Sequence, residues 1–299
     1  MLPAPPPLRP LGTDGPAMAP LAWGMWRFAG HSIDEARAMI DAAFDIGVTL
    51  FDTADIYGFG EQGFGAAEAL LGDVFAATPG LRGRMILATK GGITPPVPYD
   101  SSRAWLTRAI DDSLRRLQTE HVDLWQVHRP DILTHPAEVA RTLEDAHRAG
   151  KIGAVGVSNH TAAQIDALRA ALTIPLVSTQ PEFSPLCLDP ITDGALDRAM
   201  RDGTTVFAWS PLGGGRIASP DSPRTVAVAA ALDAVAAGHG VSRATAAFSW
   251  IMHHPAHPIP IIGSQNPARI REAGAAQTLR WTRADWYAVL VAARGEGLP

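Results

Sequence analysis

Residues 48–58, V-T-L-F-D-T-A-D-I-Y-G, are the stretch from which the fold and the site can be worked out. The segment begins as an apolar run of β-branched and aromatic type. It ends in a polar cluster that contains Asp52, Asp55 and Tyr57, followed by Gly58. A buried parallel strand that delivers polar groups to a loop at its carboxyl end has this pattern. We therefore ask which other segments converge on this loop.

Short apolar segments alternate with amphipathic helices on both sides of this stretch. The pattern predicts strands at 21–24, 48–52, 85–90, 122–128, 154–157, 176–179, 205–209 and 258–262, and helices at 32–46, 66–75, 102–118, 136–149, 162–171, 190–201, 223–237, 242–253, 267–275 and 282–293. Eight such units indicate an α/β fold, a (β/α)₈ TIM barrel forming a single domain over residues 1–299. A short N-terminal β-hairpin precedes the barrel, and an extra C-terminal helix ends it.

Composition narrows the classes of function. The chain has 299 residues, a formal net charge of −5 and one cysteine, Cys187. A lone cysteine excludes a disulfide or a cysteine-based metal cage within one chain, and dispersed charge argues against nucleic acid or a membrane surface as a partner. The proline-rich start lacks the apolar core of a secretory signal, and no apolar run reaches membrane-spanning length. We therefore expect a cytoplasmic protein.

Four polar side chains follow three consecutive predicted strands. They are Asp52, Tyr57, Lys90 and His128. Neighbouring strands lie about 4.8 Å apart, so these groups are expected to meet at one end of the barrel. Lysine occurs only at positions 90 and 151 in a chain rich in arginine, which makes a lysine at a strand end notable.

These four groups form a plausible proton-delivery unit. An ammonium beside a phenol favours the phenolate and so is expected to lower the pKa of Tyr57. A carboxylate orients the ammonium, and an imidazole can hydrogen-bond a carbonyl oxygen. The combination predicts a general acid that protonates an oxyanion as it forms, with Tyr57 as proton donor. We interpret Asp55 as a structural residue of the turn.

Several motifs, in this order along nearly the whole chain, resemble the aldo-keto reductase superfamily. They are D-T-A-D-I-Y-G, A-T-K, D-L-W-Q-V-H-R-P-D, G-A-V-G-V-S-N, S-T-Q-P-E-F-S, A-W-S-P-L-G-G-G and P-I-I-G-S-Q-N-P-A-R-I. The resemblance implies a (β/α)₈ barrel and reversible NADPH-dependent reduction of aldehydes or ketones, without a metal. Asp52, Tyr57, Lys90 and His128 match the family's catalytic tetrad, in which His128 would orient the carbonyl.

The resemblance also implies cofactor-binding positions. Ser158, Asn159 and Gln180 match the residues that hold the carboxamide, and Trp209 matches the aromatic ring that stacks on the nicotinamide. The remaining matches are Gly24 and Met25 at the nicotinamide ribose, Ser210, Leu212, Gly213, Gly214, Gly215 and Arg216 along the pyrophosphate, and Ser264, Arg269 and Glu272 around the adenosine end.

Two departures from the family pattern affect the expectations. Many relatives carry Lys or Arg where this chain has Gly263 or Gln265, and often Asn where it has Ala273 beside Glu272, so the expected preference for NADPH over NADH rests mainly on Arg269. The chain also ends soon after the last helix, without a long tail to cover the pocket. Substrate specificity is therefore expected from Trp26, Phe28, Phe59 and Arg129, whereas Trp125, inside a strand, is expected in the core.

Other interpretations are weaker. The G-x-G-x-x-G pattern at 58–63 is not followed by a strand ending in an acidic residue, so we interpret it as a loop and not as a dinucleotide fingerprint. His253, His254 and His257 are interpreted as residues of a helix C-terminus. A metal-dependent hydrolase would place Lys90 among its ligands. A nicotinamide-binding sensor or accessory subunit without turnover is the alternative to a reductase, and we find no added partner-binding segment that favours it.

Overall fold

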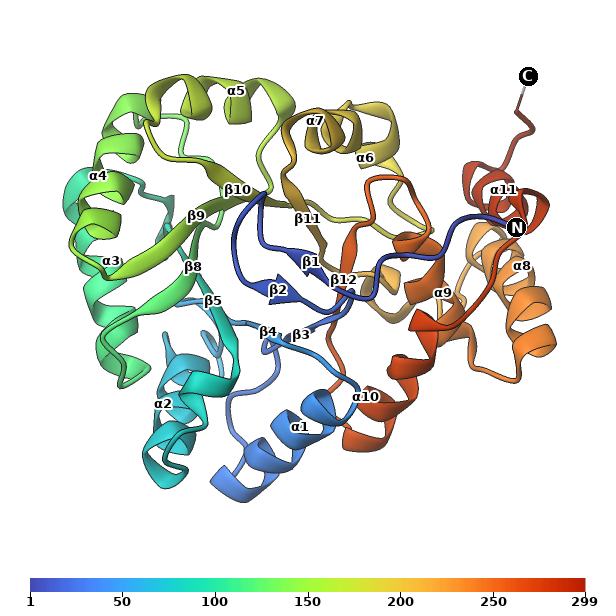
Figure 1. Ribbon diagram of the computed structural model, residues 1–299, viewed down its shortest axis with the longest axis horizontal. Coiled ribbons are helices and arrows are strands. Elements are labelled where there is room, and N and C mark those ends of the chain that lie inside the picture. Colours follow the sequence, from blue (N-terminus) through green and yellow to red (C-terminus); the bar gives the residue numbers. More distant parts are fainter. Residues whose placement is uncertain (299) are drawn as a thin grey trace.

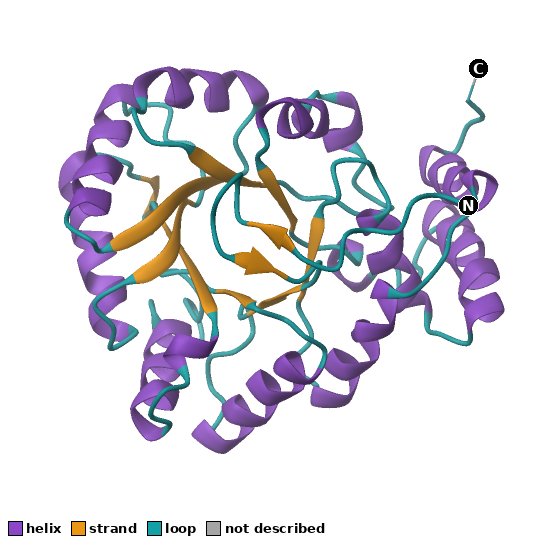
Figure 2. Ribbon diagram, in the orientation of Figure 1, coloured by secondary structure: helices purple, strands orange, loops and turns teal. Residues whose placement is uncertain are grey.

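Eight parallel strands close into a barrel in the computed structural model, which describes residues 1–298 (Figures 1 and 2). Around the barrel the order is β10-β11-β12-β3-β4-β5-β8-β9. Each barrel strand therefore pairs with the next barrel strand in the chain, and the last, β12, pairs with the first, β3. The strands are β3 (Ala22–Gly24), β4 (Leu50–Asp52), β5 (Ile86–Gly91), β8 (Val122–Val127), β9 (Ile152–Ser158), β10 (Leu176–Gln180), β11 (Thr205–Ala208) and β12 (Ile259–Ile262). The predicted (β/α)₈ architecture is confirmed.

Helices cover the outside of the barrel (Figure 2). They are α1 (Ile33–Asp45), α2 (Ala66–Ala77), α3 (Arg103–Arg116), α4 (Pro136–Arg148), α5 (Ala162–Ala171), α6 (Asp189–Thr192), α7 (Ala195–Asp202), α8 (Pro223–His239), α9 (Arg243–Met252), α10 (Pro267–Ala273) and α11 (Arg283–Arg294), with short 3₁₀ turns at Arg82–Arg84, Gly213–Gly215 and Gly274–Gln277. A capping box begins α1, because the Ser32 side chain accepts from the Glu35 N–H and Glu35 accepts from the Ser32 N–H.

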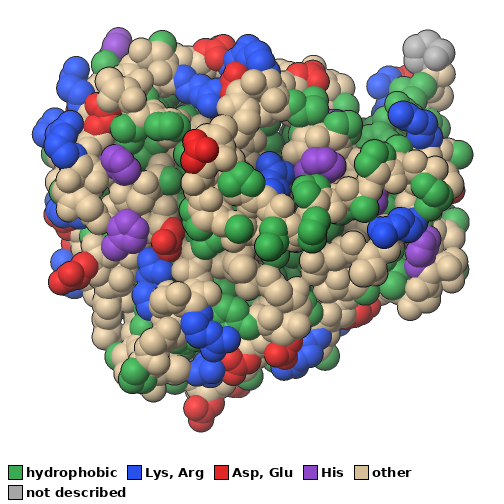
Figure 3. Space-filling model, in the orientation of Figure 1, with side chains coloured by type: hydrophobic (Ala, Val, Ile, Leu, Met, Phe, Trp, Pro, Cys, Tyr) green, Lys and Arg blue, Asp and Glu red, His purple; other side chains and the backbone are tan. Residues whose placement is uncertain are grey.

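A short hairpin closes the amino-terminal end of the barrel, as the sequence predicts. It consists of β1 (Arg9–Pro10) and β2 (Ala17–Met18), which lie in front of the strands in Figure 1. The Gly12 N–H donates to Thr205 Oγ1 at 3.0 Å, and the Ala19 N–H donates to Thr49 Oγ1 at 3.2 Å. Figure 3 shows this face covered by side chains, with acidic and basic groups spread around its edge. The polar strand exits therefore meet at the opposite end.

The C-terminal helix is anchored by two tryptophans. The rings of Trp250 in α9 and Trp286 in α11 stack with centroids 4.7 Å apart. Each indole N–H donates to the other residue's carbonyl oxygen at 3.0 Å. A buried Trp needs such a partner for its N–H, and here one pair satisfies both. This contact explains why α11, outside the eight βα units, packs firmly on the barrel.

Two elements differ from the predictions. The single helix predicted at 190–201 is broken into α6 and α7, because Gly194 adopts a left-handed conformation (φ 84°) and Asp193 Oδ1 accepts from the Ala195 N–H at 2.8 Å. A second hairpin, β6 (Ile93–Thr94) with β7 (Val97–Tyr99), was not predicted, since its prolines argue against strands.

Within residues 1–298 no single helix is both long and apolar enough to cross a membrane. Helices α8 and α9 meet the length and composition criteria only when taken together, and they are bent by 96°.

Two helical glycines predict opposite effects on stability. A Cβ at Gly72 in α2 would lie 2.1 Å from the Arg116 carbonyl oxygen at the end of α3, whereas a Cβ at Gly238 in α8 would meet nothing within 4 Å. We expect Gly72→Ala to destabilise the fold by roughly 2 kcal/mol through overpacking. Gly238→Ala should be neutral or stabilising by up to about 1 kcal/mol. Urea unfolding of both variants tests this, and an unaffected Gly72→Ala would contradict the close approach of α2 to α3.

Candidate active site

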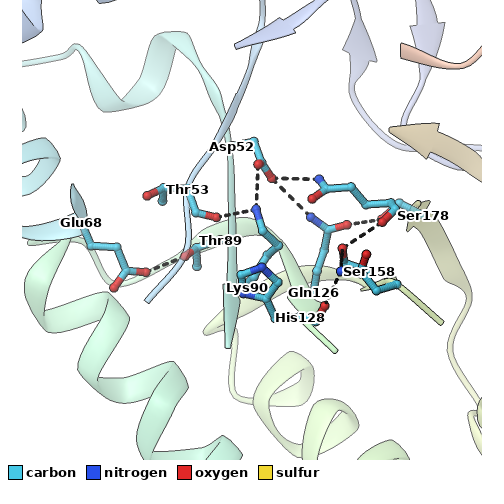
Figure 4. A network of polar contacts seen from close by, with 11 residues as sticks. Asp52, Thr53, Glu68, Thr89, Lys90, Gln126, His128, Ser158 and Ser178 are labelled. Atoms are coloured by element: carbon cyan, nitrogen blue, oxygen red, sulfur yellow. Dashed lines mark hydrogen bonds and ion pairs between the residues drawn. The ribbon is translucent and has the colours of Figure 1, made fainter. Parts of the chain in front are cut away.

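The four predicted side chains converge at the carboxyl end of the barrel, where Figure 4 shows Asp52, Lys90 and His128. Asp52 ends β4, Lys90 lies in β5 next to it, and His128 follows β8. Tyr57 lies in the loop after β4, where its N–H donates to the Ala54 carbonyl at 3.1 Å. All four are at least 92% buried, with exposed fractions of 2% for Asp52, 8% for Tyr57, 0% for Lys90 and 8% for His128. Three neighbouring strand ends thus bring them to one place.

Lys90 is held by two oxygen atoms. Its Nζ lies 2.7 Å from Asp52 Oδ2 and 2.8 Å from the Thr53 carbonyl oxygen. Burial lowers the pKa of Lys90, but the attraction of Asp52 and Tyr57 outweighs it, so the pKa stands above its ordinary value. Lys90 is therefore a fixed, buried cation.

The Tyr57 ring lies between Lys90, His128 and the exit of the first strand. Lys90 Nζ is 5.0 Å from the ring centroid, and the His128 ring centroid is 5.9 Å away. Trp26 packs edge-on against Tyr57 with centroids 5.0 Å apart. The phenol is thus surrounded by a cation, an imidazole and one exposed indole.

Lys90 lowers the pKa of Tyr57 as expected, but this effect does not decide the net shift, which is upward. Burial raises the pKa of Tyr57, and the opposing attraction of Lys90 is smaller. The physical reason is that a buried phenolate loses its hydration, and Asp52 already compensates much of the Lys90 charge. Tyr57 is therefore a protonated phenol at neutral pH.

His128 is a neutral imidazole at neutral pH. Its pKa is well below the usual value, first because of burial and then because of the positive charges of Lys90 and Arg129. Its Nδ1 is buried and has no hydrogen-bond partner among residues 1–298. Because Nδ1 is enclosed by protein, the other ring nitrogen, Nε2, is the one that can donate to or accept from a small ligand placed beside Tyr57.

The second oxygen of Asp52 serves the other side of the site. Oδ1 accepts from Gln180 Nε2 at 3.1 Å and lies 3.5 Å from Gln126 Nε2. Ser178 Oγ donates to Gln126 Oε1 at 3.4 Å (Figure 4). Sequence reasoning missed Gln126 and Ser178. Their signal was polarity at buried strand positions that the pattern otherwise reserves for apolar residues.

The predicted carboxamide-binding residues form one hydrogen-bonded chain. Ser158 Oγ donates to the Gln180 carbonyl at 2.8 Å, and Asn159 Nδ2 donates to Ser158 Oγ at 3.0 Å and to the His128 carbonyl at 3.1 Å. The Trp209 indole N–H donates to Asn159 Oδ1 at 2.9 Å. Asn159 adopts a left-handed conformation with φ 59°, which aims its amide back into this chain. These residues are therefore brought together as predicted.

The glycine-rich loop after β11 is a tight, partly exposed turn. Gly213, Gly214 and Gly215 all have positive φ, and Ser210 Oγ accepts from the Gly214 N–H at 2.9 Å. A Cβ at Gly214 or Gly215 would meet no atom within 4 Å, so the surface above this turn is open. Leu212 is half-buried and Arg216 is exposed, with its Nε donating to the Gly213 carbonyl at 2.9 Å.

The residues predicted near the ribose and adenosine lie at the end of β3 and beyond β12, the two strands that come next after β11 around the barrel. Met25 is buried and its N–H donates to the Asp52 carbonyl at 2.9 Å. The Gly24 carbonyl accepts from Gln265 Nε2 at 3.1 Å, which ties this strand exit to the loop that contains the half-buried Ser264. Arg269 and Glu272 are exposed on α10.

The four predicted pocket residues do not share one environment. Trp26 and Phe59 are exposed, by 61% and 55%, and Arg129 is half-buried next to His128. Phe28 is fully buried and packs edge-on against Trp23, with ring centroids 5.7 Å apart. The structure therefore places Phe28 in the hydrophobic core with Trp125, away from the exposed rim.

The glycine pattern at 58–63 and the histidines at 253–257, which we did not assign to a binding site, can be located in the structure. Gly58, Gly60 and Gly63 all have positive φ in a turn between β4 and α2, and α2 begins only at Ala66. His253 Nδ1 lies 2.8 Å from the Ser249 carbonyl at the end of α9. No group of three His, Cys, Asp or Glu residues within the described part of the chain is arranged to hold a metal ion.

Comparison with known proteins agrees with this geometry. A sequence model of the Aldo/keto reductase family matches residues 20–289. A 6-dehydroglucose reductase from Novosphingobium aromaticivorans is 60% identical and the match covers 100% of this chain and 99% of that protein. A second 6-dehydroglucose reductase, from Agrobacterium fabrum, is 35% identical over 95% of this chain and 97% of that one.

A solved structure has the same fold. The glycerol dehydrogenase of Gluconobacter oxydans aligns with a TM-score of 0.80 and 28% identity, covering 95% of this chain and 94% of that one. The chain therefore belongs to the Aldo/keto reductase family. It is an oxidoreductase that acts on the carbonyl group of small molecules, and the family generally uses NAD(P)H.

Proposed function

We propose that this protein is an NADPH-dependent reductase that converts 6-dehydroglucose to glucose. 6-Dehydroglucose carries an aldehyde where glucose carries its C6 alcohol, so the reaction is a carbonyl reduction. The observation that carries the proposal is the buried Lys90–Asp52 pair beside the protonated Tyr57 and the neutral His128. The sugar substrate is supported by the relative that is 60% identical over the full chain.

In this proposal Tyr57 is the proton donor. When bound, NADPH supplies a hydride to the carbonyl carbon. The Tyr57 hydroxyl gives its proton to the carbonyl oxygen, and the Lys90 ammonium stabilises the phenolate left behind. Asp52 holds the ammonium in place, and neutral His128 orients the carbonyl with a hydrogen bond. A charged imidazolium is disfavoured by Lys90 and by burial, which keeps this role fixed across neutral pH.

Two surfaces support binding of a dinucleotide across the barrel mouth. Ser158, Asn159 and Gln180 present amide and hydroxyl groups beside Trp209, whose indole offers a stacking face. The open turn that ends at Arg216 accommodates the pyrophosphate. Ser264, Arg269 and Glu272 lie at the adenosine end, and Arg269 supplies the positive charge for a 2′-phosphate. Trp26, Phe59 and Arg129 form the substrate side.

A turnover assay with purified protein tests the function. NADPH oxidation should follow addition of 6-dehydroglucose, with glucose as the product identified by mass spectrometry. A generic aldehyde should react more slowly, because it cannot use the polar contacts of the rim. If the protein quenches NADPH fluorescence but does not oxidise NADPH with any aldehyde tested, the result would instead support the sensor or accessory-subunit alternative.

Arg269→Ala tests the cofactor preference. The guanidinium is exposed on α10, and a charge-assisted hydrogen bond to a 2′-phosphate contributes about 1.5–3 kcal/mol. We expect the KM for NADPH to rise about tenfold or more while the KM for NADH stays within twofold. Arg271→Ala is the matched control, since Arg271 lies on the same helix and pairs with Asp45 at 2.8 Å. Equal effects on both cofactors would contradict the assignment.

A further inference from the structure

The carboxyl group of Asp55 lies inside the protein and takes part in none of the contacts described so far. Asp55 is fully buried, and neither of its carboxyl oxygens has a hydrogen-bond partner among residues 1–298. Burial strips a carboxylate of its hydration, so an ionised and unpaired side chain here would be strongly unfavourable. An orphaned buried group of this kind needs a physical explanation.

Asp55 is joined to the backbone of the site. Its N–H donates to the Lys90 carbonyl oxygen at 3.0 Å. Its carboxyl lies against Gly91, because a Cβ there would be 2.9 Å from Asp55 Oδ2 and 2.7 Å from Trp125 Cζ2. The Trp125 indole N–H is also buried without a partner. The carboxyl thus occupies a small space that exists because residue 91 is glycine.

The nearby cations are engaged by other anions. Glu68 in α2 accepts from Arg116 Nε of α3 at 2.8 Å and from Thr89 Oγ1 at 2.5 Å (Figure 4). Lys90 is bound to Asp52 in β4. Burial raises the pKa of Asp55 well above its usual value, and repulsion from Glu68 adds to this, whereas the opposing effects of Arg116, of the nearby Ile56 backbone N–H and of Lys90 are smaller.

We propose that Asp55 is a further positioning residue of this site, a buried carboxylic acid that stays un-ionised at neutral pH and so leaves the Lys90 charge to Asp52 and Tyr57. The importance of this un-ionised state for the reaction rests on the proposed function. A negative Asp55 raises the pKa of Tyr57 and makes the phenol a poorer proton donor. The neutral acid avoids this, and burial together with the negative charge of Glu68 keeps it neutral.

The pH dependence of stability tests the charge state. In the unfolded chain Asp55 ionises above roughly pH 4, whereas the folded protein keeps the proton. Unfolding therefore releases a proton. Between about pH 4 and the pKa of Asp55 in the folded protein, the ratio of the wild-type unfolding constant to that of Asp55→Asn should rise by up to about tenfold per pH unit. Asp55→Ala is measured in parallel. Asp73→Asn, exposed on α2, is the control and should show no such trend.

Direct titration of Tyr57 tests the coupling. The chain has three tyrosines, so Tyr99→Phe/Tyr287→Phe leaves Tyr57 as the only phenol whose ultraviolet absorption changes after a rapid pH jump. At the high pH where Tyr57 titrates, Asp55 has passed its own pKa and is a carboxylate, so in this background Asp55→Asn removes a negative charge and should lower the Tyr57 midpoint by several tenths of a pH unit or more. An unchanged midpoint overturns the coupling.

Two results overturn the un-ionised state of Asp55. One is a ratio of unfolding constants that stays constant between pH 5 and 8. The other is a wild-type infrared spectrum at pH 7 without a protonated carboxyl band, a measurement that needs no variant to fold. None of these readouts uses substrate or turnover, so a failure here is distinct from a failure of the proposed reductase activity.

Discussion

Tyr57→Phe should reduce kcat for carbonyl reduction about 10³-fold while leaving NADPH affinity within twofold. The substitution removes only the hydroxyl, and a positioned general acid contributes roughly 10²–10⁴ to a rate. The ring itself stays, so its edge contacts with Trp26 and His128 remain. Steady-state kinetics with fluorescence titration of NADPH separate the two quantities.

Tyr287→Phe is the matched control for this result, because Tyr287 is 44% exposed on α11, far along the chain from the site. It should retain wild-type kcat. A Tyr57→Phe protein that keeps full activity would falsify the assignment of Tyr57 as proton donor, and a large loss of NADPH affinity would place Tyr57 in the cofactor site instead.

Lys90→Met should give the largest loss of stability of any substitution named here, about 3–5 kcal/mol. The side chain fits the space, but the change leaves Asp52 as a buried carboxylate without its counter-ion. Reductase activity should fall as well, because the phenolate of Tyr57 loses its stabilising cation. Urea unfolding and steady-state kinetics measure the two effects.

Two controls separate charge from packing in this experiment. Lys151→Met removes the chain's only other lysine, which pairs with Asp111 on the surface and is 38% exposed, so it should cost less than about 1 kcal/mol. The double variant Asp52→Asn/Lys90→Met should regain much of the lost stability without regaining activity. If the double variant is no more stable than Lys90→Met, the loss arises from packing and not from the unpaired carboxylate.

The barrel could be predicted from sequence because its signal is local and repeated. Each short apolar strand ends in a polar or glycine-rich exit, and that alternation fixes both the fold and the end at which Asp52, Lys90 and His128 meet. The break between α6 and α7 was missed because one glycine decides it, and Pro95 and Pro96 hid the second hairpin.

The predictions about the site that differ from the structure depend on burial, which no local sequence pattern encodes. The sign of the Tyr57 pKa shift follows from the loss of hydration competing with Lys90, and a sequence shows only the charges. Phe28 was expected at the rim for its aromatic type, yet it lies in the core. Asp55 was interpreted as a turn residue, because only the folded chain shows that its carboxyl has no hydrogen-bond partner in the part of the chain that the structure describes.

The two carboxylate oxygens of Asp52 bind different groups, and this affects where substitutions can change the substrate range of this enzyme. One oxygen is bound to Lys90 and the other to Gln180, so this carboxylate joins the group beside the proposed proton donor to a residue proposed to hold the carboxamide. Substitution of Asp52 should therefore disturb both sides of the site together. New substrates must therefore arise through the exposed loops, where Trp26 and Phe59 can change while this shared junction is inherited intact.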